Sequence, residues 1–200
     1  MNKLIVLFLG IWMSCTTSAQ DIKLPAPNRT GGQPLMKALN ERKSTRDFQD
    51  QELSLQQLSD LLWAANGFNR DDKRTAPTAN NRQELELYVA LKSGLYFYDA
   101  KSNMLKIIKE GDYRKNTGTQ DYVATAALNV VFVADMDKAS SEQYAFTDCG
   151  FIAQNIYLYC ASEGLGSGVR GSFNKEELGE LLQLKNNEQV LLTQSVGYAR

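Results

Sequence analysis

The spacing of hydrophobic residues predicts that the chain begins with two helices. Apolar residues within 35–39 suggest a short helix. Ser54 and Gln57 form a capping-box pattern at the start of an apolar stripe that continues through 55–65. Gly67 is expected to close this second helix, because glycine is favoured just past a helix end.

The rest of the chain alternates between strand-like and helix-like patterns. The expected strands are residues 85–91, 94–98, 104–108, 129–134 and 189–196. The expected helices are residues 120–128, 143–163 and 174–184. Residues 99–103 would close a hairpin, and the strongly apolar run 129–134 indicates a central strand. Residues 67–83 are expected to be a polar loop, and the glycine-rich residues 164–171 a turn.

This order of elements predicts an α+β fold with a mixed sheet. Three segments follow from the pattern. Residues 1–19 form a signal peptide, 20–33 an extended arm with two prolines and two glycines, and 34–200 a single folded domain. The sequence shows no internal repeat and no low-complexity tract.

The N-terminus has the pattern of a secretory signal. Lys3 precedes the apolar run 4–13, which is too short to span a bilayer comfortably. Small residues follow, and cleavage after Ala19 would release an exported, periplasmic protein. The alternative is cleavage before Cys15 with lipid attached to that cysteine, which is the only way in which we expect contact with a membrane.

The amino-acid composition excludes several classes of function. The 200 residues carry 22 basic and 23 acidic side chains, so no basic excess favours nucleic-acid binding. Histidine is absent, which excludes Ser-His-Asp and Cys-His nucleophiles and HExxH zinc sites. Three cysteines are too few for an all-cysteine zinc site, so no metal is expected. Cys149 and Cys160 would lie about 16 Å apart on one helix, too far for a disulfide. Any catalysis must therefore use carboxylates, hydroxyls, lysines or a bound cofactor.

Three segments could carry that chemistry. Residues 42–46 bring three cations and two hydroxyls together, as a phosphate site does, although a solvated charged loop would look the same. Residues 74–83 collect amides, hydroxyls and cations that suit the edge of a heterocycle, with an ordinary polar loop as the alternative. Residues 166–171 match the pattern GxGxxG, but a helix precedes them where a dinucleotide site needs a strand. We interpret these glycines as positions of close backbone packing.

Taken in order, these segments resemble the FMN-dependent nitroreductase family. The resemblance rests on Arg-Lys-Ser-Thr-Arg at 42–46 and Pro-Thr-Ala-Asn-Asn-Arg-Gln at 77–83. Further along, it rests on Gln-Asn-Ile-Tyr-Leu at 154–158, Gly-Leu-Gly at 164–166 and Ser-Val-Gly-Tyr at 195–198. It covers about residues 35–200, and the order and spacing of the motifs carry it more than any single motif.

Within the family, Gly-Leu-Tyr-Phe-Tyr-Asp at 94–99 is more similar to the branch that contains azoline-oxidising dehydrogenases. The family resemblance implies a largely antiparallel sheet flanked by helices, and a homodimer with FMN at the subunit interface. It implies these cofactor-binding residues: Arg42, Lys43, Ser44, Arg46, Pro77, Thr78, Ala79, Asn81, Arg170, Gly171 and Arg200.

The resemblance also implies a role for most of these residues. Arg42 and Ser44 would contact the phosphate or ribityl chain, Arg46 the phosphate or the pyrimidine edge, and Arg200 the phosphate. Asn81 would hydrogen-bond the flavin ring. Residues 77–79 would line the flavin wall of the facing subunit, and the backbone of residues 170–171 would lie near N5.

The function implied by the resemblance is that of an exported FMN-dependent oxidoreductase. Hydride would pass through flavin N5 in ping-pong fashion, to or from a small conjugated substrate such as a nitroaromatic, quinone or enone. No side chain would be catalytic, and NAD(P)H is a candidate electron donor. Two alternatives stay open: a non-catalytic envelope protein that binds flavin or another small molecule, and a flavin-consuming or dehalogenating member of the same fold.

Overall fold

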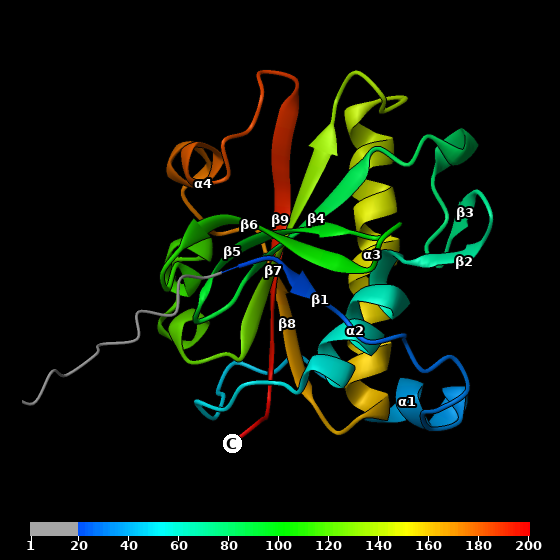
Figure 1. The fold of residues 1–200 in the computed structure, drawn as a ribbon. Helices are drawn as coiled ribbons and strands as arrows, with labels where there is room; N and C mark the ends of the chain where they lie inside the picture. Colours follow the sequence, from blue (N-terminus) through cyan, green and yellow to red (C-terminus); the bar gives the residue numbers. More distant parts are fainter. Residues whose placement is uncertain (1–19) are drawn as a thin grey trace, which may run out of the picture.

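The computed structural model describes residues 20–200, so the predicted signal peptide and Cys15 lie outside the described residues. Its main sheet has seven strands in the order β1-β6-β5-β4-β7-β9-β8, and every neighbouring pair is antiparallel (Figure 1). The strands are β1 Ile22–Lys23, β4 Leu85–Ala90, β5 Gly94–Asp99, β6 Met104–Glu110, β7 Leu128–Asp135, β8 Gly166–Arg170 and β9 Glu188–Gly197. A separate two-stranded sheet pairs β2 Phe68–Arg70 with β3 Lys73–Arg74.

Helices lie on both sides of the main sheet. Figure 1 shows α1, α2 and α3 on one side and α4 on the other. The α-helices are α1 Leu35–Glu41, α2 Leu55–Asn66, α3 Glu142–Ser162 and α4 Lys175–Leu181. Three short 3₁₀ turns complete the fold: η1 Ala79–Asn81, η2 Arg114–Thr117 and η3 Asp121–Ala124. The predicted fold class, an α+β fold with a largely antiparallel sheet flanked by helices, is confirmed.

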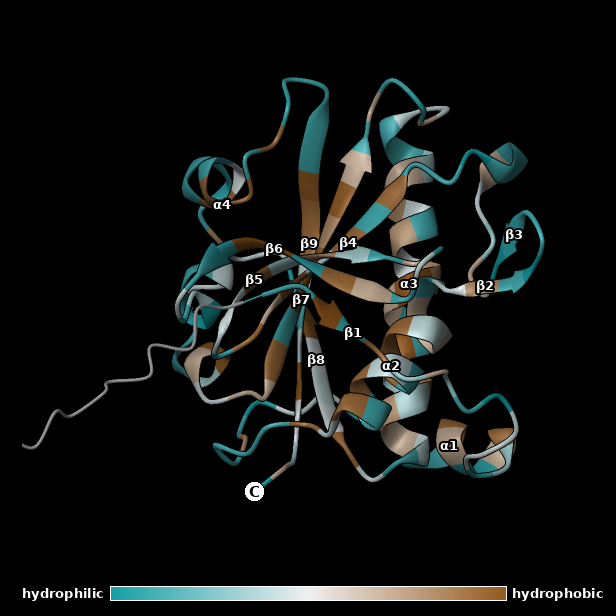
Figure 2. Ribbon diagram, viewed as in Figure 1, coloured by the Kyte–Doolittle hydropathy of each residue, from teal (hydrophilic) through white to brown (hydrophobic). Residues whose placement is uncertain are grey.

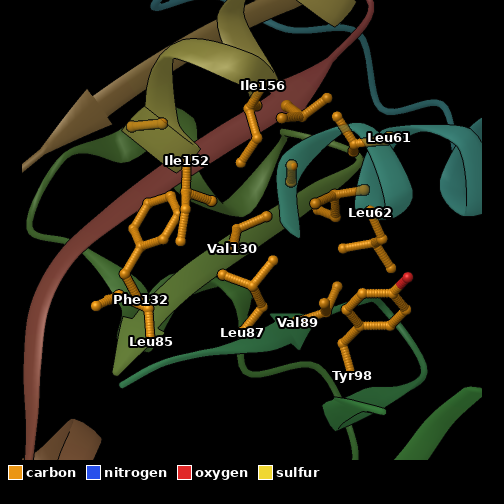
Figure 3. Packing of buried hydrophobic residues seen from close by; sticks show 14 of the residues in the cluster. Leu61, Leu62, Leu85, Leu87, Val89, Tyr98, Val130, Phe132, Ile152 and Ile156 are labelled. Carbon is orange, nitrogen blue, oxygen red and sulfur yellow. The ribbon is translucent and has the colours of Figure 1, made fainter. Parts of the chain in front are cut away.

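The centre of the sheet is buried on both faces, and β7 is apolar at most of its positions for this reason. Val130 and Phe132 point to the core under α2 and α3, together with Ile152 and Ile156 of α3 (Figure 3). Val131, next in sequence, belongs to a second cluster that packs against α4. Because alternate side chains of a strand point to opposite faces, a strand covered on both sides is apolar at most positions, and buried Asn129 is an exception that accepts a hydrogen bond from Arg170. Figure 2 shows this hydrophobic centre with hydrophilic residues toward the edges.

Several local predictions are confirmed by the backbone. Ser54 and Gln57 form the expected capping box at the start of α2. Asn174 caps α4 by accepting a hydrogen bond from the Glu177 N–H. Cys149 and Cys160 are both buried and both free. In residues 20–200 no helix is both long enough and apolar enough to cross a bilayer.

Two predictions are wrong. Residues 120–128 do not form a helix: a single 3₁₀ turn, η3, ends at Ala124, and Leu128 already pairs with Val196 of β9. Residues 166–170 are not part of a turn, because they form edge strand β8 beside β9. In both cases pairing with β9 determines the local conformation, and tertiary pairing overrides local propensity. The polar segment 67–83 also contains more regular structure than expected, since it includes β2, β3 and η1.

Candidate functional site

The segment that follows α1 runs along the free edge of β8. Ser44 forms a parallel bridge with Ser167, and the Thr45 N–H donates to the Ser167 carbonyl oxygen at 2.7 Å. A Cβ atom at Gly166 or Gly168 would lie 2.7 Å from atoms of Thr45, closer than side chains tolerate. The glycines of β8 therefore allow this close approach, as the interpretation of residues 166–171 as packing positions expected.

The C-terminus lies against the same segment. Phe48 forms an antiparallel bridge with Ala199, and the Gln49 N–H donates to the Tyr198 carbonyl at 2.9 Å. Arg200 donates its backbone N–H to the Asp47 carbonyl at 3.3 Å, and its guanidinium lies 3.8 Å from the Asp47 carboxylate. The structure thus brings one group of predicted residues onto two adjoining segments: Arg42, Lys43, Ser44, Arg46 and Arg200.

Tyr157 of α3 contacts two residues of this group and the backbone of β8. Its hydroxyl accepts a hydrogen bond from the Val169 N–H at 2.9 Å and lies 3.0 Å from the Ser44 hydroxyl. The Arg42 guanidinium lies 5.3 Å from the centre of the Tyr157 ring, within the range of a cation–π contact. Lys43 and Tyr157 line a cavity of about 430 Å³ that extends to Gly164. The cavity is large enough for part of a cofactor.

The cations around this cavity are largely free to bind an anion. Within residues 20–200, Arg42, Lys43 and Arg46 take part in no ion pair, and Ser44 is exposed. Glu41, the nearby acid, pairs with Lys37 at 3.7 Å. Guanidinium groups and a hydroxyl at neighbouring positions are the donors that bind phosphate most strongly. We refer to Arg42, Lys43, Ser44, Arg46 and Arg200 below as the cationic cluster.

Arg170 is placed differently from the cationic cluster. Its side chain is buried and donates to the Ser195 hydroxyl at 2.7 Å, the Asn129 side-chain oxygen at 2.8 Å and the Thr117 hydroxyl at 3.2 Å. Burial lowers the pKa of this guanidinium, and the neighbouring Tyr122 side chain opposes the shift only in part. Its Nε atom is buried without a hydrogen-bond partner. Gly171, the next predicted residue, is exposed, so only the backbone here faces a ligand.

The second predicted group, residues 77–81, lies beside a different part of α3. The Ala79 N–H donates to the Asp148 carboxylate at 2.8 Å, and the Thr78 hydroxyl accepts from the Gln83 N–H at 3.0 Å. Asp148 and Tyr157 are nine residues apart on α3, about 13 Å along its axis. Within one chain the loop therefore does not join the cationic cluster.

Asn81 has a constrained position in this loop. Its backbone φ is +54°, in the left-handed region that asparagine tolerates better than most residues. Its side-chain oxygen accepts from the Gln83 amide at 3.0 Å. Its amide nitrogen makes a long contact of 3.4 Å to the Asp72 carbonyl. The loop is thus held by its own side chains, and exposed Pro77 and Asn81 face outward.

A buried carboxyl pair lies beneath this loop. Glu84 is 1% exposed and Asp148 is 2% exposed, and neither Glu84 oxygen has a hydrogen-bond partner. Burial raises the pKa of Glu84, and the neighbouring Asp148 carboxylate raises it further, while Arg82 opposes the shift. At this site Glu84 is therefore biased toward its neutral form.

The family model described as "Nitroreductase family" matches residues 39–198 of the chain. The match includes the cationic cluster except Arg200, and all strands from β2 to β9. The chain belongs to the nitroreductase family.

Similar proteins agree with this family assignment over most of the chain. A nitroreductase-like protein of Ralstonia eutropha JMP134 is 44% identical, with a TM-score of 0.86 over 92% of this chain and 91% of that chain. The nitroreductase-like protein MJ1384 of Methanocaldococcus jannaschii is 29% identical over 80% of this chain and 88% of its own. An FMN-dependent nitroreductase of Clostridium difficile R20291 shares the fold, with a TM-score of 0.61 at 21% identity over 82% of this chain and 87% of that chain.

Sequence reasoning about this nitroreductase missed Tyr157, Asp148 and Glu84. Tyr157 and Asp148 stand at buried positions of α3, where the apolar stripe predicts hydrophobic side chains. A polar group at such a position needs a partner, and that requirement is the signal that could have found both residues. Glu84 directly precedes the apolar start of β4, and nothing in its sequence context shows that it is buried.

Proposed function

We propose that the protein is an FMN-dependent oxidoreductase that acts on small conjugated molecules. The observation that carries the proposal is the cationic cluster. Lys43 lines the cavity, Arg42 and Arg46 are its neighbours in sequence, and none of the three has an ion-pair partner within residues 20–200. These donors fit the phosphate end of FMN, and bound FMN would supply hydride transfer. The similarity to a protein named as an FMN-dependent nitroreductase supports the same cofactor.

The chain would bind and orient the cofactor rather than react with it. The cationic cluster would hold the phosphate, and Tyr157 would fix Ser44 and the β8 backbone relative to each other. Arg170, the last residue of β8, is buried, and a buried cation favours negative charge that develops nearby.

The complete site would form between two copies of the chain. Residues 77–81 lie too far along α3 to meet the cationic cluster of their own chain, but their exposed face is free to meet that of a second copy. Large apolar side chains are exposed on the helices beside the cationic cluster: Leu35 at 62% and Met36 at 75% on α1, and Phe151 at 43% on α3. Exposed apolar side chains gathered on adjacent helices are typical of a subunit interface.

Donor, acceptor and location follow as further parts of the proposal. A single pocket that serves both reaction partners predicts ping-pong kinetics. Residues 1–19 are proposed to direct export to the periplasm, with a lipid anchor at Cys15 as the alternative. NAD(P)H is scarce outside the cytoplasm, so another reductant could serve there. Gly94–Asp99, which forms β5, suggests the branch that contains azoline-oxidising dehydrogenases.

Titration of the purified protein with FMN tests this function. We expect saturable binding, and Arg42→Ala should weaken it by about 1.5–3 kcal/mol, the cost of losing a charged hydrogen bond. Lys175→Ala, which removes an exposed cation at the start of α4, is the matched control and should leave the affinity unchanged. Absence of FMN binding in the native chain would refute the proposal.

Activity assays separate the two alternatives. A protein that binds FMN but shows no turnover with any donor would be a binding protein of the envelope. Halide release or consumption of the flavin itself, detected by product analysis, would indicate the dehalogenating or flavin-consuming activity.

A further inference from the structure

A second cavity lies away from the cationic cluster and contains none of the predicted cofactor residues. It measures about 470 Å³ and lies between the N-terminal arm, α2, the β2–β3 hairpin and the turn that joins β5 to β6. Its volume is within the range of sites that bind small molecules.

Three aromatic side chains from three elements line this cavity: Trp63 of α2, Phe68 of β2 and Tyr98 of β5. The Trp63 indole N–H donates to the Phe68 carbonyl at 3.0 Å. The Tyr98 hydroxyl donates to the Asn103 side-chain oxygen at 3.2 Å. Gly67 lets the chain turn tightly against Trp63, because a Cβ there would lie 2.7 Å from the Trp63 Cα atom. The Trp63 and Tyr98 side chains are therefore held by hydrogen bonds, and the Arg74 guanidinium lies 4.6 Å from the centre of the Phe68 ring.

Cations dominate the rim of the cavity. Arg29, Arg70 and Lys101 line it, with Asp71 as the one lining carboxylate. The Arg29 guanidinium lies 5.2 Å from the centre of the Trp63 ring. None of the three cations is in an ion pair within the described part of the chain, residues 20–200.

The cavity on the other side of Trp63 has the opposite charge balance. It measures about 430 Å³ and is lined by two carboxylates, Asp60 and Glu163, with Arg29 as its one cation. The two cavities share Trp63, so both offer an aromatic surface. Only the first combines that surface with an excess of unpaired cations, and this difference determines the ligand class.

We propose that the cavity between Trp63, Phe68 and Tyr98 binds a planar aromatic carboxylate. The ring system of the ligand would stack on the partly exposed rings of Trp63 and Phe68, while Tyr98 is buried in the wall of the cavity. Stacking favours flat ligands over saturated ones. Its carboxylate would face Arg29, Arg70 and Lys101, which can bind an anion without breaking an existing ion pair. None of these residues is among the proposed flavin-binding residues, so ligand binding here does not depend on whether the protein binds FMN.

Calorimetric titration of the full-length protein with three matched probes tests the chemistry. The probes are 2-naphthoate, its neutral analogue 2-naphthamide and the saturated anion decahydro-2-naphthoate. We expect 2-naphthoate to bind at least tenfold more tightly than either analogue. Equal affinity for the amide would overturn the anion requirement, equal affinity for the saturated acid would overturn the stacking, and absence of 2-naphthoate binding would overturn the site.

Variants test the location. The double variant Arg70→Gln/Lys101→Gln changes exposed side chains and should weaken 2-naphthoate binding at least tenfold, while the control Lys175→Gln should not change it. Unchanged binding in the double variant would place the ligand elsewhere and overturn the inference. Arg42→Ala should retain full 2-naphthoate affinity, and saturating FMN should not displace the probe. Displacement by FMN would show that the probe occupies the cofactor site instead.

Discussion

At the scale of single residues, Glu84 is the group whose environment least suits its charge. Its carboxyl is 1% exposed, lacks a hydrogen-bond partner and lies close to the Asp148 carboxylate. An ionised carboxylate pays a large desolvation cost at such a position unless a partner compensates. Arg82 provides only a partial compensation, since the net effect is a raised pKa for Glu84. The position therefore has a direct consequence for stability as a function of pH.

Glu84→Gln should flatten the dependence of stability on pH. A carboxyl whose folded pKa is raised above the ordinary 4.5 contributes stability below that value, and this stability is lost as the pH rises through the folded pKa. We expect the native chain to lose free energy of unfolding as the pH rises above about 4.5, and the variant to lose less. Urea unfolding across pH 5–8 measures this. Parallel profiles for the two proteins would show that Glu84 ionises in the folded state as freely as in the unfolded state.

At the scale of elements, the contact between the segment after α1 and β8 depends on glycine. Gly168→Ala would place a Cβ 2.7 Å from the Thr45 carbonyl oxygen, a backbone atom that cannot rotate away. We expect a loss of about 1–3 kcal/mol in the free energy of unfolding, as in other overpacked sites. Gly179→Ala in α4 is the control. No atom lies within 4 Å of that position, and alanine should stabilise the helix by up to about 1 kcal/mol. Equal stability of both variants would contradict the close contact.

The same contact explains what sequence patterns could and could not predict about the elements. The capping box of α2 and the apolar run of β7 are local sequence features, and from them the start of α2 and the interior place of β7 in the sheet were predicted correctly. β8 consists of Gly-Ser-Gly-Val-Arg, which has low strand propensity, and it is a strand because β9 and Thr45 flank it. Residues 125–128 are not helical, contrary to the prediction, for the same reason: β7 starts at Leu128 and pairs with β9. The pairing of strands that are distant in sequence leaves no pattern in the local sequence.

At the scale of the whole molecule, the candidate site illustrates the same limit. The side-chain chemistry of residues 42–46 was enough to suggest a cluster that could bind phosphate. Arg200 joins this cluster because Phe48 and Ala199 form a β-bridge. These two residues are 151 positions apart in the sequence, and the spacing of motifs does not predict their pairing. The distance along α3 between the cluster and residues 77–81 is also a property of the folded chain. In the proposed shared site, a second copy would supply residues 77–81, because this distance separates them from the cationic cluster of their own chain.

Phe151→Asp tests whether the site is shared between two copies. Phe151 is 43% exposed on α3, and a carboxylate there would have to lose its hydration if the face is buried in a dimer. We expect the native chain to sediment as a dimer and Phe151→Asp as a monomer. FMN affinity should fall together with dimerisation, because residues 77–81 of the second copy would no longer complete the site.

Leu55→Asp is the matched control, since Leu55 is 51% exposed but lies at the start of α2 rather than on α1 or α3. It should leave both the sedimentation coefficient and the FMN affinity unchanged. A Phe151→Asp monomer with native FMN affinity would show that one chain suffices to bind the cofactor, and the 13 Å along α3 would then have to be spanned within a protomer. A Phe151→Asp dimer would place the interface on a different face. Sedimentation velocity and FMN titration on the same samples therefore separate the position of the interface from its role in the site.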